Sequence, residues 1–341
     1  MKRAINILSL IPFLIILSCT PDLPEGPSVN KIFSLDGSIY ETDLDYPYFY
    51  VAAYTDGFWR IDLSSDEHTA IELALLDSSQ NITQANYIDA HGNEVIALTE
   101  NNVWRSISYG NVWYRSEIGI DQIFYPQALS RSPFNPSKLF LVNQGDAMYS
   151  SSNWGESWKK GTESGSSGYY YSYWDPFRPG DIWLEGMLSI GEQFIVCVEN
   201  YGASEKEVNV PQYNEIAWFT SMWFDSTSIY MRTGDSNGRY VMKSDDGGYS
   251  WDEMTTGIPD TSRINSIFQN PIQPSTLYLT NNYHDIIYCS TDTLRSIFEI
   301  VRFEFANERE NIIKIYYEPA LNSLIVVTLY GIYEVSLDEI E

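Results

Sequence analysis

The chain has 341 residues, of which 44% are hydrophobic and 15% aromatic, and its formal net charge is −26. This length suits two ordinary domains or one large all-β domain. A surface so acidic repels phosphate backbones and anionic lipids, so nucleic acid is excluded as an expected partner, as is direct contact with anionic lipid.

The first 28 residues are predicted to be an export signal and a tether. Met1-Lys2-Arg3 precedes the apolar run 5–17, which has the features of a signal peptide and is too short for a confident membrane span. The run ends in Ser18-Cys19, which resembles the lipobox of bacterial lipoproteins. That resemblance implies a signal peptide over residues 1–18, cleavage before Cys19, lipidation of Cys19 and anchoring in the bacterial cell envelope, with the outer membrane favoured. The Pro-rich residues 19–28 would then be a flexible tether; the alternative is an ordinary secretory signal with a chance cysteine.

A short apolar strand recurs through the rest of the chain at a nearly constant spacing. Its equivalent position is occupied by Trp59, Trp104, Tyr149, Val196, Met242, Tyr288 and Tyr333, with steps of 45 to 47 residues. A period in this range is typical of β-propellers and solenoids. Each repeat is predicted to hold four short strands, which in the third repeat are 127–130, 138–142, 147–151 and 156–160. Four strands correspond to one blade, so residues 29–341 are predicted to form an all-β, seven-bladed β-propeller of antiparallel blades.

The two ends of this domain are predicted to pair with each other. The last repeat ends after its third strand, at 331–335, and the first repeat is preceded by an extra strand at 30–35. We expect this extra strand to complete the last blade, because a closed ring leaves no free sheet edge. Residues 67–76 have the composition of a short helix, but the repeat assigns them the outer strand of the first blade.

The turn at 243–251 carries the best-formed motif of the sequence. Its residues Ser244, Asp246, Gly248, Ser250 and Trp251 can form a tight turn, in which the aspartate accepts backbone hydrogen bonds and the glycine takes a positive φ. The spacing Ser-x-Asp-x-Gly-x-Ser-Trp resembles the Asp-box, or BNR repeat, of sialidase-type propellers. A second copy keeps Ser151, Gly155 and Trp158, with Asn153 in place of the aspartate. The resemblance implies a structural role for these residues.

A candidate ligand face is predicted opposite these turns. Because successive turns alternate between the two ends of a blade, the second-to-third-strand turns and the fourth-to-first-strand loops gather on one face around the central channel. The residues expected there are Tyr54, Asp56, Glu100, Asn143, Asp146, Tyr170, Asp235, Arg239, Arg263, Tyr283 and His284. Aromatic faces stack on pyranose rings and polar groups bind hydroxyls, so this rim suits sugar recognition. The alternative is that the exposed loops of any acidic, tyrosine-rich protein look the same.

The catalytic residues of sialidases do not transfer to this chain. That family uses three arginines, a Tyr–Glu pair and an aspartate on six blades, with an Arg-Ile-Pro tripeptide, whereas Arg60-Ile61-Asp62 departs from the tripeptide at its third position. His68, His91 and His284 lie in different repeats without metal-ligand spacing, so neither a metal site nor a cofactor is predicted. Glycoside hydrolysis stays open, because carboxylates could converge at the channel mouth from Asp56, Glu100, Asp146, Glu192 and Asp235.

Cys197 and Cys289 occupy equivalent positions two blades apart, too distant for a disulfide, and are predicted to be free, buried thiols of a monomer. The sequence therefore predicts a non-catalytic envelope lipoprotein whose loop face binds a protein or glycan partner. One alternative is a glycoside hydrolase or lyase with carboxylates at the channel mouth. The other is an assembly or stability factor for a membrane complex, similar to the seven-bladed BNR-type factors.

Overall fold

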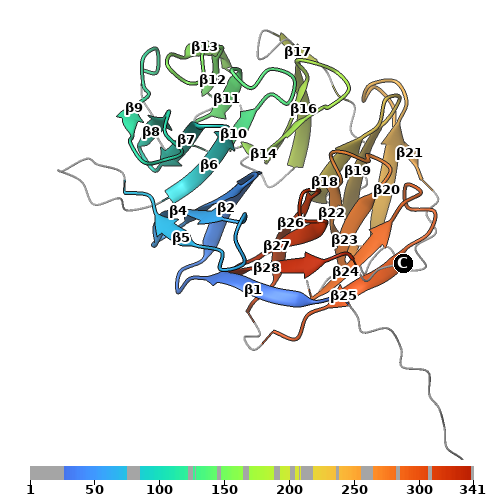
Figure 1. The fold of residues 1–341 in the computed structure, drawn as a ribbon. Helices are drawn as coiled ribbons and strands as arrows, with labels where there is room; N and C mark the ends of the chain where they lie inside the picture. Colours follow the sequence, from blue (N-terminus) through green and yellow to red (C-terminus); the bar gives the residue numbers. More distant parts are fainter. Residues whose placement is uncertain are drawn as a thin grey trace, which may run out of the picture.

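The computed structural model describes residues 27–74, 85–121, 126, 128–143, 147–163, 169–187, 193–199, 204–206, 208, 218–235, 238–254, 264–281, 285–305 and 309–338. Within them, the strands form seven four-stranded antiparallel sheets, which Figure 1 shows following one another around the molecule in chain order. This is the seven-bladed β-propeller predicted from the repeat. No helix in this described part of the chain is long and apolar enough to cross a membrane.

Six blades are built from four consecutive strands that run in order from the innermost to the outermost. Blade 1 holds β2 (Ile39–Asp45), β3 (Tyr48–Ala53), β4 (Gly57–Asp62) and β5 (Ala70–Glu72), and blade 2 holds β6 (Ala85–His91), β7 (Glu94–Thr99), β8 (Asn102–Ser106) and β9 (Tyr114–Arg115). Blade 3 holds β10 (Ala128–Arg131), β11 (Leu139–Val142), β12 (Ala147–Ser151) and β13 (Lys159–Glu163), and blade 4 holds β14 (Tyr169–Trp174), β15 (Ile182–Met187), β16 (Gln193–Glu199) and β17 (Ser204–Lys206). Blade 5 holds β18 (Trp218–Phe224), β19 (Ile229–Asp235), β20 (Gly238–Ser244) and β21 (Asp252–Glu253), and blade 6 holds β22 (Ile264–Gln269), β23 (Leu277–Asn281), β24 (Ile286–Ser290) and β25 (Phe298–Arg302).

Blade 7 joins the two ends of the domain. It holds β26 (Ile312–Glu318), β27 (Ser323–Thr328) and β28 (Gly331–Ser336), and its outer strand is β1 (Val29–Ser34). Figure 1 shows β1 lying alongside β28, and the register places Lys31 opposite Tyr333. The predicted closure of the ring is confirmed. The outer strand predicted within residues 67–76 is also confirmed, because β5 pairs with β4.

The core consists of one hydrophobic cluster at each seam between neighbouring blades. Tyr50 and Trp104 belong to the cluster between blades 1 and 2, and Phe49 and Ile325 to the cluster between blades 7 and 1. Every blade is therefore covered on both sides, which explains why second strands such as β3 and β27 are nearly continuous apolar runs.

The two cysteines of the propeller, Cys197 and Cys289, are buried and form no disulfide, as predicted. Burial raises the pKa of the Cys289 thiol to about 11, so the thiol stays protonated at neutral pH and packs as a small apolar group. Cys19 lies outside the described residues.

The turn between β20 and β21 has the hydrogen bonds predicted for it. Asp246 accepts from the Ser250 amide at 2.9 Å and from its hydroxyl at 2.6 Å, while the Ser244 hydroxyl accepts from the Gly248 amide at 2.8 Å. The Trp251 indole closes the turn by donating to the Gly248 carbonyl at 3.2 Å. Gly248 has a φ of 96°, and a Cβ there would lie 2.6 Å from the ring of Trp183, so the turn requires glycine on both counts.

In the copy of this turn in blade 3, the side-chain amide of Asn153 takes the place of the Asp246 carboxylate. Asn153 accepts from the Ser157 amide at 3.0 Å and donates to the Ser157 hydroxyl at 2.9 Å. The fourth strand of this blade, predicted at 156–160, begins later, at Lys159. The reason is that Trp158 still belongs to the turn, where its backbone amide donates to the Ile118 carbonyl at 2.7 Å and its indole nitrogen donates to the Ser116 carbonyl at 3.0 Å.

Candidate functional site

The two faces of the propeller follow from the hydrogen bonds of the turns. In blades 2, 3 and 6, the third-to-fourth-strand turn donates a backbone hydrogen bond to the first-to-second-strand turn of the same blade, from Tyr109 to Asn93, from Trp154 to Ser137 and from Thr293 to Ser275. These turns share one face, which we term the box face. The second-to-third-strand turns and the fourth-to-first-strand loops form the opposite face, which we term the loop face.

The structure describes some of the predicted ligand residues of the loop face in full, others only in their backbone, and others not at all. Tyr54 and Asp56 lie in the β3–β4 turn, Glu100 lies in the β7–β8 turn, and Asn143 is buried after β11. For three others only the backbone is described, within β14, β19 and β20: Tyr170, Asp235 and Arg239. The remaining four lie outside the described residues: Asp146, Arg263, Tyr283 and His284. Blades 1 and 2 therefore carry the part of the predicted site whose geometry can be built.

Three tyrosines meet where blades 1 and 2 adjoin on this face, and we term them the tyrosine seam. The ring centroid of Tyr40, in β2, lies 6.5 Å from that of Tyr54 and 5.9 Å from that of Tyr87, in β6. Tyr40 is 53% exposed and Tyr54 40% exposed. Only Tyr54 was predicted, because Tyr40 and Tyr87 lie inside inner strands rather than in loops.

Tyr40 owes its position to a bulge. The ladder between β2 and β3 slips between Ile39 and Glu41, so that Tyr40 is the extra residue. The same slip occurs at the loop-face end of β6, β14, β18, β22 and β26. Bulges of this kind redirect side chains and are frequent beside binding sites. They mark the channel mouth on the loop face as a place where the backbone departs from regular pairing.

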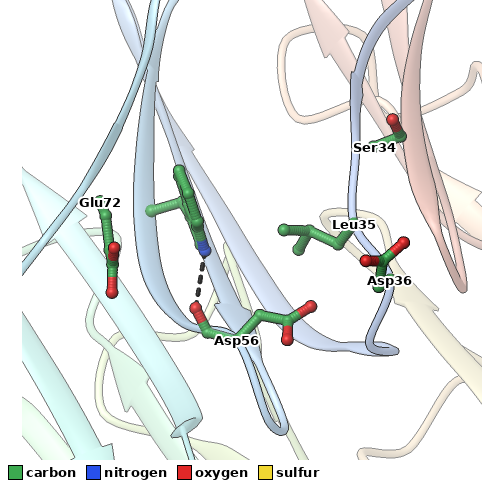
Figure 2. Close-up of a pocket in the computed structure, with 6 residues that line it drawn as sticks. Ser34, Leu35, Asp36, Asp56 and Glu72 are labelled. Carbon is green, nitrogen blue, oxygen red and sulfur yellow. Dashed lines mark hydrogen bonds between the residues drawn. The ribbon is translucent and has the colours of Figure 1, made fainter.

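A hollow of about 420 Å³ opens on the other side of the β3–β4 turn, and we term it the acidic hollow. Figure 2 shows the residues that line it: Ser34, Leu35, Asp36, Asp56, Trp59 and Glu72. Its lining holds three carboxylates, an indole and no cationic side chain.

Hydrogen bonds to the backbone and one contact between aromatic rings fix two walls of the acidic hollow. The Trp59 indole donates to the Asp56 carbonyl at 2.8 Å and packs against Phe33, whose ring centroid is 5.5 Å away. The Asp56 carboxylate accepts from the Gly37 amide at 2.7 Å. A Cβ at position 37 would lie 2.5 Å from the Thr55 hydroxyl and 2.7 Å from the Asp56 carboxylate, so a larger residue there would displace these side chains. The Asp36 and Glu72 carboxylates have no ion pair within the described part of the chain and face solvent.

A second group of charged residues, which was not predicted, lies on the inner strands. Lys314 of β26 contacts Glu41 of β2 at 2.5 Å. Asp43 accepts from the Ala90 amide at 2.6 Å, and Asp89 accepts from the Arg131 guanidinium. Burial raises the pKa of both aspartates, with the charge of Asp89 adding to the rise at Asp43, while Arg131 opposes the rise at Asp89.

The sequence held a signal for this pair, since Asp43 and Asp89 are 46 residues apart, one repeat period. Each is held by a neighbouring blade, and Asp43 and Asp89 serve to bond the inner strands together. Within the described residues, no group of three or more His, Cys, Asp or Glu side chains could hold a metal ion.

No family model matches the chain, and no curated protein matches it by sequence. Among solved structures, YCF48 bound to a D1 peptide is similar, with 14% identity over 92% of this chain and 98% of that chain and a TM-score of 0.66. YCF48 from Cyanidioschyzon merolae has 13% identity over 92% and 99% of the two chains and a TM-score of 0.64. An ancestral GH74 enzyme has 12% identity over 90% of this chain, which covers only 46% of that enzyme, and a TM-score of 0.68. At these identities the likeness shows a shared β-propeller fold.

Proposed function

We propose that this chain is a non-catalytic binding protein that holds a polypeptide partner against its loop face, with a basic side chain of the partner in the acidic hollow. The observation that carries the proposal is the hollow itself, where Asp36, Asp56 and Glu72 surround the indole of Trp59. A lysine or arginine there would meet carboxylates on several sides, and an aromatic face attracts a cation further.

The charge of the whole chain supports a basic partner. The protein has 46 acidic and 20 basic residues, so its field attracts cationic segments and speeds their encounter. Among the structural neighbours, YCF48 has been solved with a peptide bound, so a propeller of this shape is compatible with a polypeptide ligand. The open hollow and exposed tyrosines also fit an assembly factor that holds a segment of a membrane complex.

Charge reversal in the hollow tests this proposal. The double substitution Asp36→Lys with Glu72→Lys is expected to reduce capture of the partner from envelope extracts at least tenfold, because the hollow would then repel a cation. Wild-type capture should also weaken steeply with salt. The matched control is Asp66→Lys with Glu67→Lys, which changes the net charge equally on the box face of the same blade. Equal loss in both double variants, or salt-independent capture, would show that the hollow is not the contact.

We propose further that Cys19 is lipidated and anchors the protein in the bacterial cell envelope. The support is the resemblance of Ser18-Cys19 to a lipobox. The propeller begins with β1 at the box face, where Val29 pairs with Val335. Residues 19–28 would span at most roughly 35 Å when extended. The anchor would therefore attach at the box face and leave the loop face directed away from the bilayer.

Cys19→Ser is expected to abolish incorporation of labelled palmitate and to shift the protein from the detergent-extracted membrane fraction to the soluble fraction. The same change leaves the propeller intact, so its melting temperature serves as the control. Unchanged fractionation of the variant would exclude lipidation as the anchor.

A further inference from the structure

The box face carries a group of exposed apolar side chains on three successive blades. They lie in the β2–β3 turn of blade 1, the β8–β9 turn of blade 2 and the β10–β11 turn of blade 3, and each is 40% to 46% exposed. We term this group the box patch: Tyr46, Ile107, Tyr109, Val112 and Phe134. Surface turns usually consist of small and polar residues, so an apolar group gathered there indicates a contact surface.

The turn of blade 2 does not depend on its own apolar side chains. The Ser106 hydroxyl accepts from the Gly110 amide at 3.0 Å. The Ser108 hydroxyl accepts from the Val112 amide, also at 3.0 Å. Neither bond uses the side chain of Ile107 or Val112, and both side chains are almost half exposed. A surface outside the chain is therefore needed to bury them.

Aromatic contacts fix the box patch across the seams between blades. The ring of Tyr109, in blade 2, lies 5.4 Å from that of Tyr48, in blade 1, and the Tyr109 carbonyl accepts from Arg60 at 2.5 Å. Between blades 2 and 3, Trp154 stacks on His91 with 6.0 Å between ring centroids. The three turns are thus fixed relative to one another at the same end of their blades, which suits a broad, flat partner.

The path of the chain indicates which flat partner this is. β1 enters the propeller at the box face, where Val29 is itself 39% exposed, and residues 19–28 lead from it to the anchor proposed at Cys19. A lipid on Cys19 would hold the box face within roughly 35 Å of the bilayer. A contact tethered in this way needs little affinity of its own. Tyrosine rings and aliphatic side chains both suit the boundary between water and lipid.

The charge of the box face limits the kind of lipid. Asp66 and Glu67 are exposed on this face in blade 1, and the formal net charge of the chain is −26. Anionic headgroups would repel such a surface. The apolar contact therefore requires a bilayer whose headgroups are zwitterionic.

We propose that the box patch rests in the headgroup region of a zwitterionic bilayer, with Ile107 and Val112 inserted at the tip of blade 2. The inference rests on the anchor proposed at Cys19, because the tether brings the patch to the bilayer. It also sets the orientation of the propeller: the box face is buried in the interface, and the acidic hollow on the loop face stays open to a partner.

Fluorescence quenching in vesicles tests the proposal. The lipidated full chain is reconstituted into phosphatidylcholine vesicles that contain a lipid with a nitroxide on its acyl chain near the headgroup. A fluorophore is attached at Ile107→Cys, at Phe134→Cys or, as the loop-face control, at Tyr54→Cys, where the tyrosine is 40% exposed. Quenching at the two box-face positions is expected to be at least threefold that at the control. The unsubstituted protein, whose Cys197 and Cys289 are buried, gives the labelling background.

Charged variants show whether the box patch makes the contact. Ile107→Asp with Val112→Asp is expected to lower quenching at Phe134→Cys at least twofold, while the protein still floats with the vesicles through its anchor. Ile71→Asp with Tyr114→Asp adds the same charge on the outer strands β5 and β9 and should leave the quenching unchanged. The melting temperatures of both double variants show that they fold. Replacing a third of the phosphatidylcholine by phosphatidylglycerol should weaken the quenching at Ile107→Cys.

Four results would overturn the proposal. Flotation with equal quenching at Ile107→Cys and Tyr54→Cys would leave the anchor in place and exclude the contact of the box face. A protein that does not float with vesicles would refute the anchor and the contact together. Equal loss of quenching in both double variants would exclude the box patch as the contact. Shielding of the label at Ile107→Cys when Cys19→Ser protein is concentrated without lipid would assign the patch to a second copy of the chain.

Discussion

A chain that begins at Leu35, and so lacks β1, is expected to melt at least roughly 10 °C below one that begins at Pro27, and to aggregate on heating. Without β1, the N-terminal segment no longer ties blade 7 to blade 1, and β28 replaces β1 as the outer edge strand of its sheet, where it can pair with other chains. The cluster between blades 7 and 1 also loses Ile32 and Phe33.

The size of this effect follows from the side chains removed. Truncating one large aromatic side chain in a core costs about 3–5 kcal/mol, and a domain of roughly 300 residues loses about 1.5 °C per kcal/mol. Phe33 packs on Trp59 at 5.5 Å between ring centroids, and the backbone pairing along β1 is lost as well. Calorimetry of the two chains measures the difference directly.

Asn30→Ala in the longer chain is the matched control. Asn30 lies in β1 with an exposed side chain, and a surface substitution of this kind usually changes stability by about 0.5 kcal/mol or less. It should therefore shift the melting temperature little. If the chain lacking β1 has the same melting temperature as the longer chain, the stability of the propeller does not depend on the pairing of β1 with β28.

The number of blades and their closure could be predicted because they are properties of the repeat. A period repeated through the chain fixes the third strand of every blade, and Trp59, Tyr149 and Tyr333 lie in β4, β12 and β28 as expected. The end of a strand is less predictable. In blade 3 the outer strand starts at Lys159, because the backbone amide of Trp158 pairs with the Ile118 carbonyl instead of with β12.

The candidate site was predicted only where it lies in turns. Tyr54 and Asp56 follow from the repeat, whereas Tyr40 is placed by a bulge that no sequence pattern marks. The acidic hollow also depends on Asp36 in the loop that joins the closing strand to blade 1. This loop exists only because the ends of the chain meet.

The inner strands show why acidic residues recur on the channel wall. The inner edge of each first strand has no strand to pair with, so its amides need acceptors from elsewhere. Asp43 supplies one to Ala90, and Asp45 supplies one to Gly92 at 2.5 Å. Between blades 5 and 6 the Ser221 hydroxyl does the same for Ile267 at 3.0 Å. The carboxylates of this wall therefore contribute to holding the ring together, and their number is not evidence for hydrolysis.

Glu185→Gln is expected to reduce the loss of stability that the wild-type protein shows between about pH 5 and 8. Glu185 lies in the apolar strand β15 and is 4% exposed. Burial raises the pKa of its carboxyl from 4.5 to about 8, opposed only by a long hydrogen bond of 3.5 Å from Tyr173.

The sign of the effect follows from proton binding. Below pH 4.5 the carboxyl is protonated in both states and its contribution is fully present. Between pH 4.5 and 8 the folded protein keeps the proton while the unfolded chain releases it, so the free energy of unfolding falls as pH rises. The fall is at most roughly 1.4 kcal/mol per pH unit, or about 4–5 kcal/mol over the window. A glutamine is neutral throughout and carries no such dependence.

Urea denaturation at pH 5, 6, 7 and 8 measures this difference. Any constant cost of burying the amide cancels in the comparison of slopes, and the other titrating groups, Asp43 included, are common to both proteins. Glu299→Gln, at a position 42% exposed in β25, is the control and should keep the wild-type slope. Equal pH dependence in Glu185→Gln and wild type would mean that the Glu185 carboxyl ionises in the fold as readily as in the unfolded chain, and that blade 4 admits water to it.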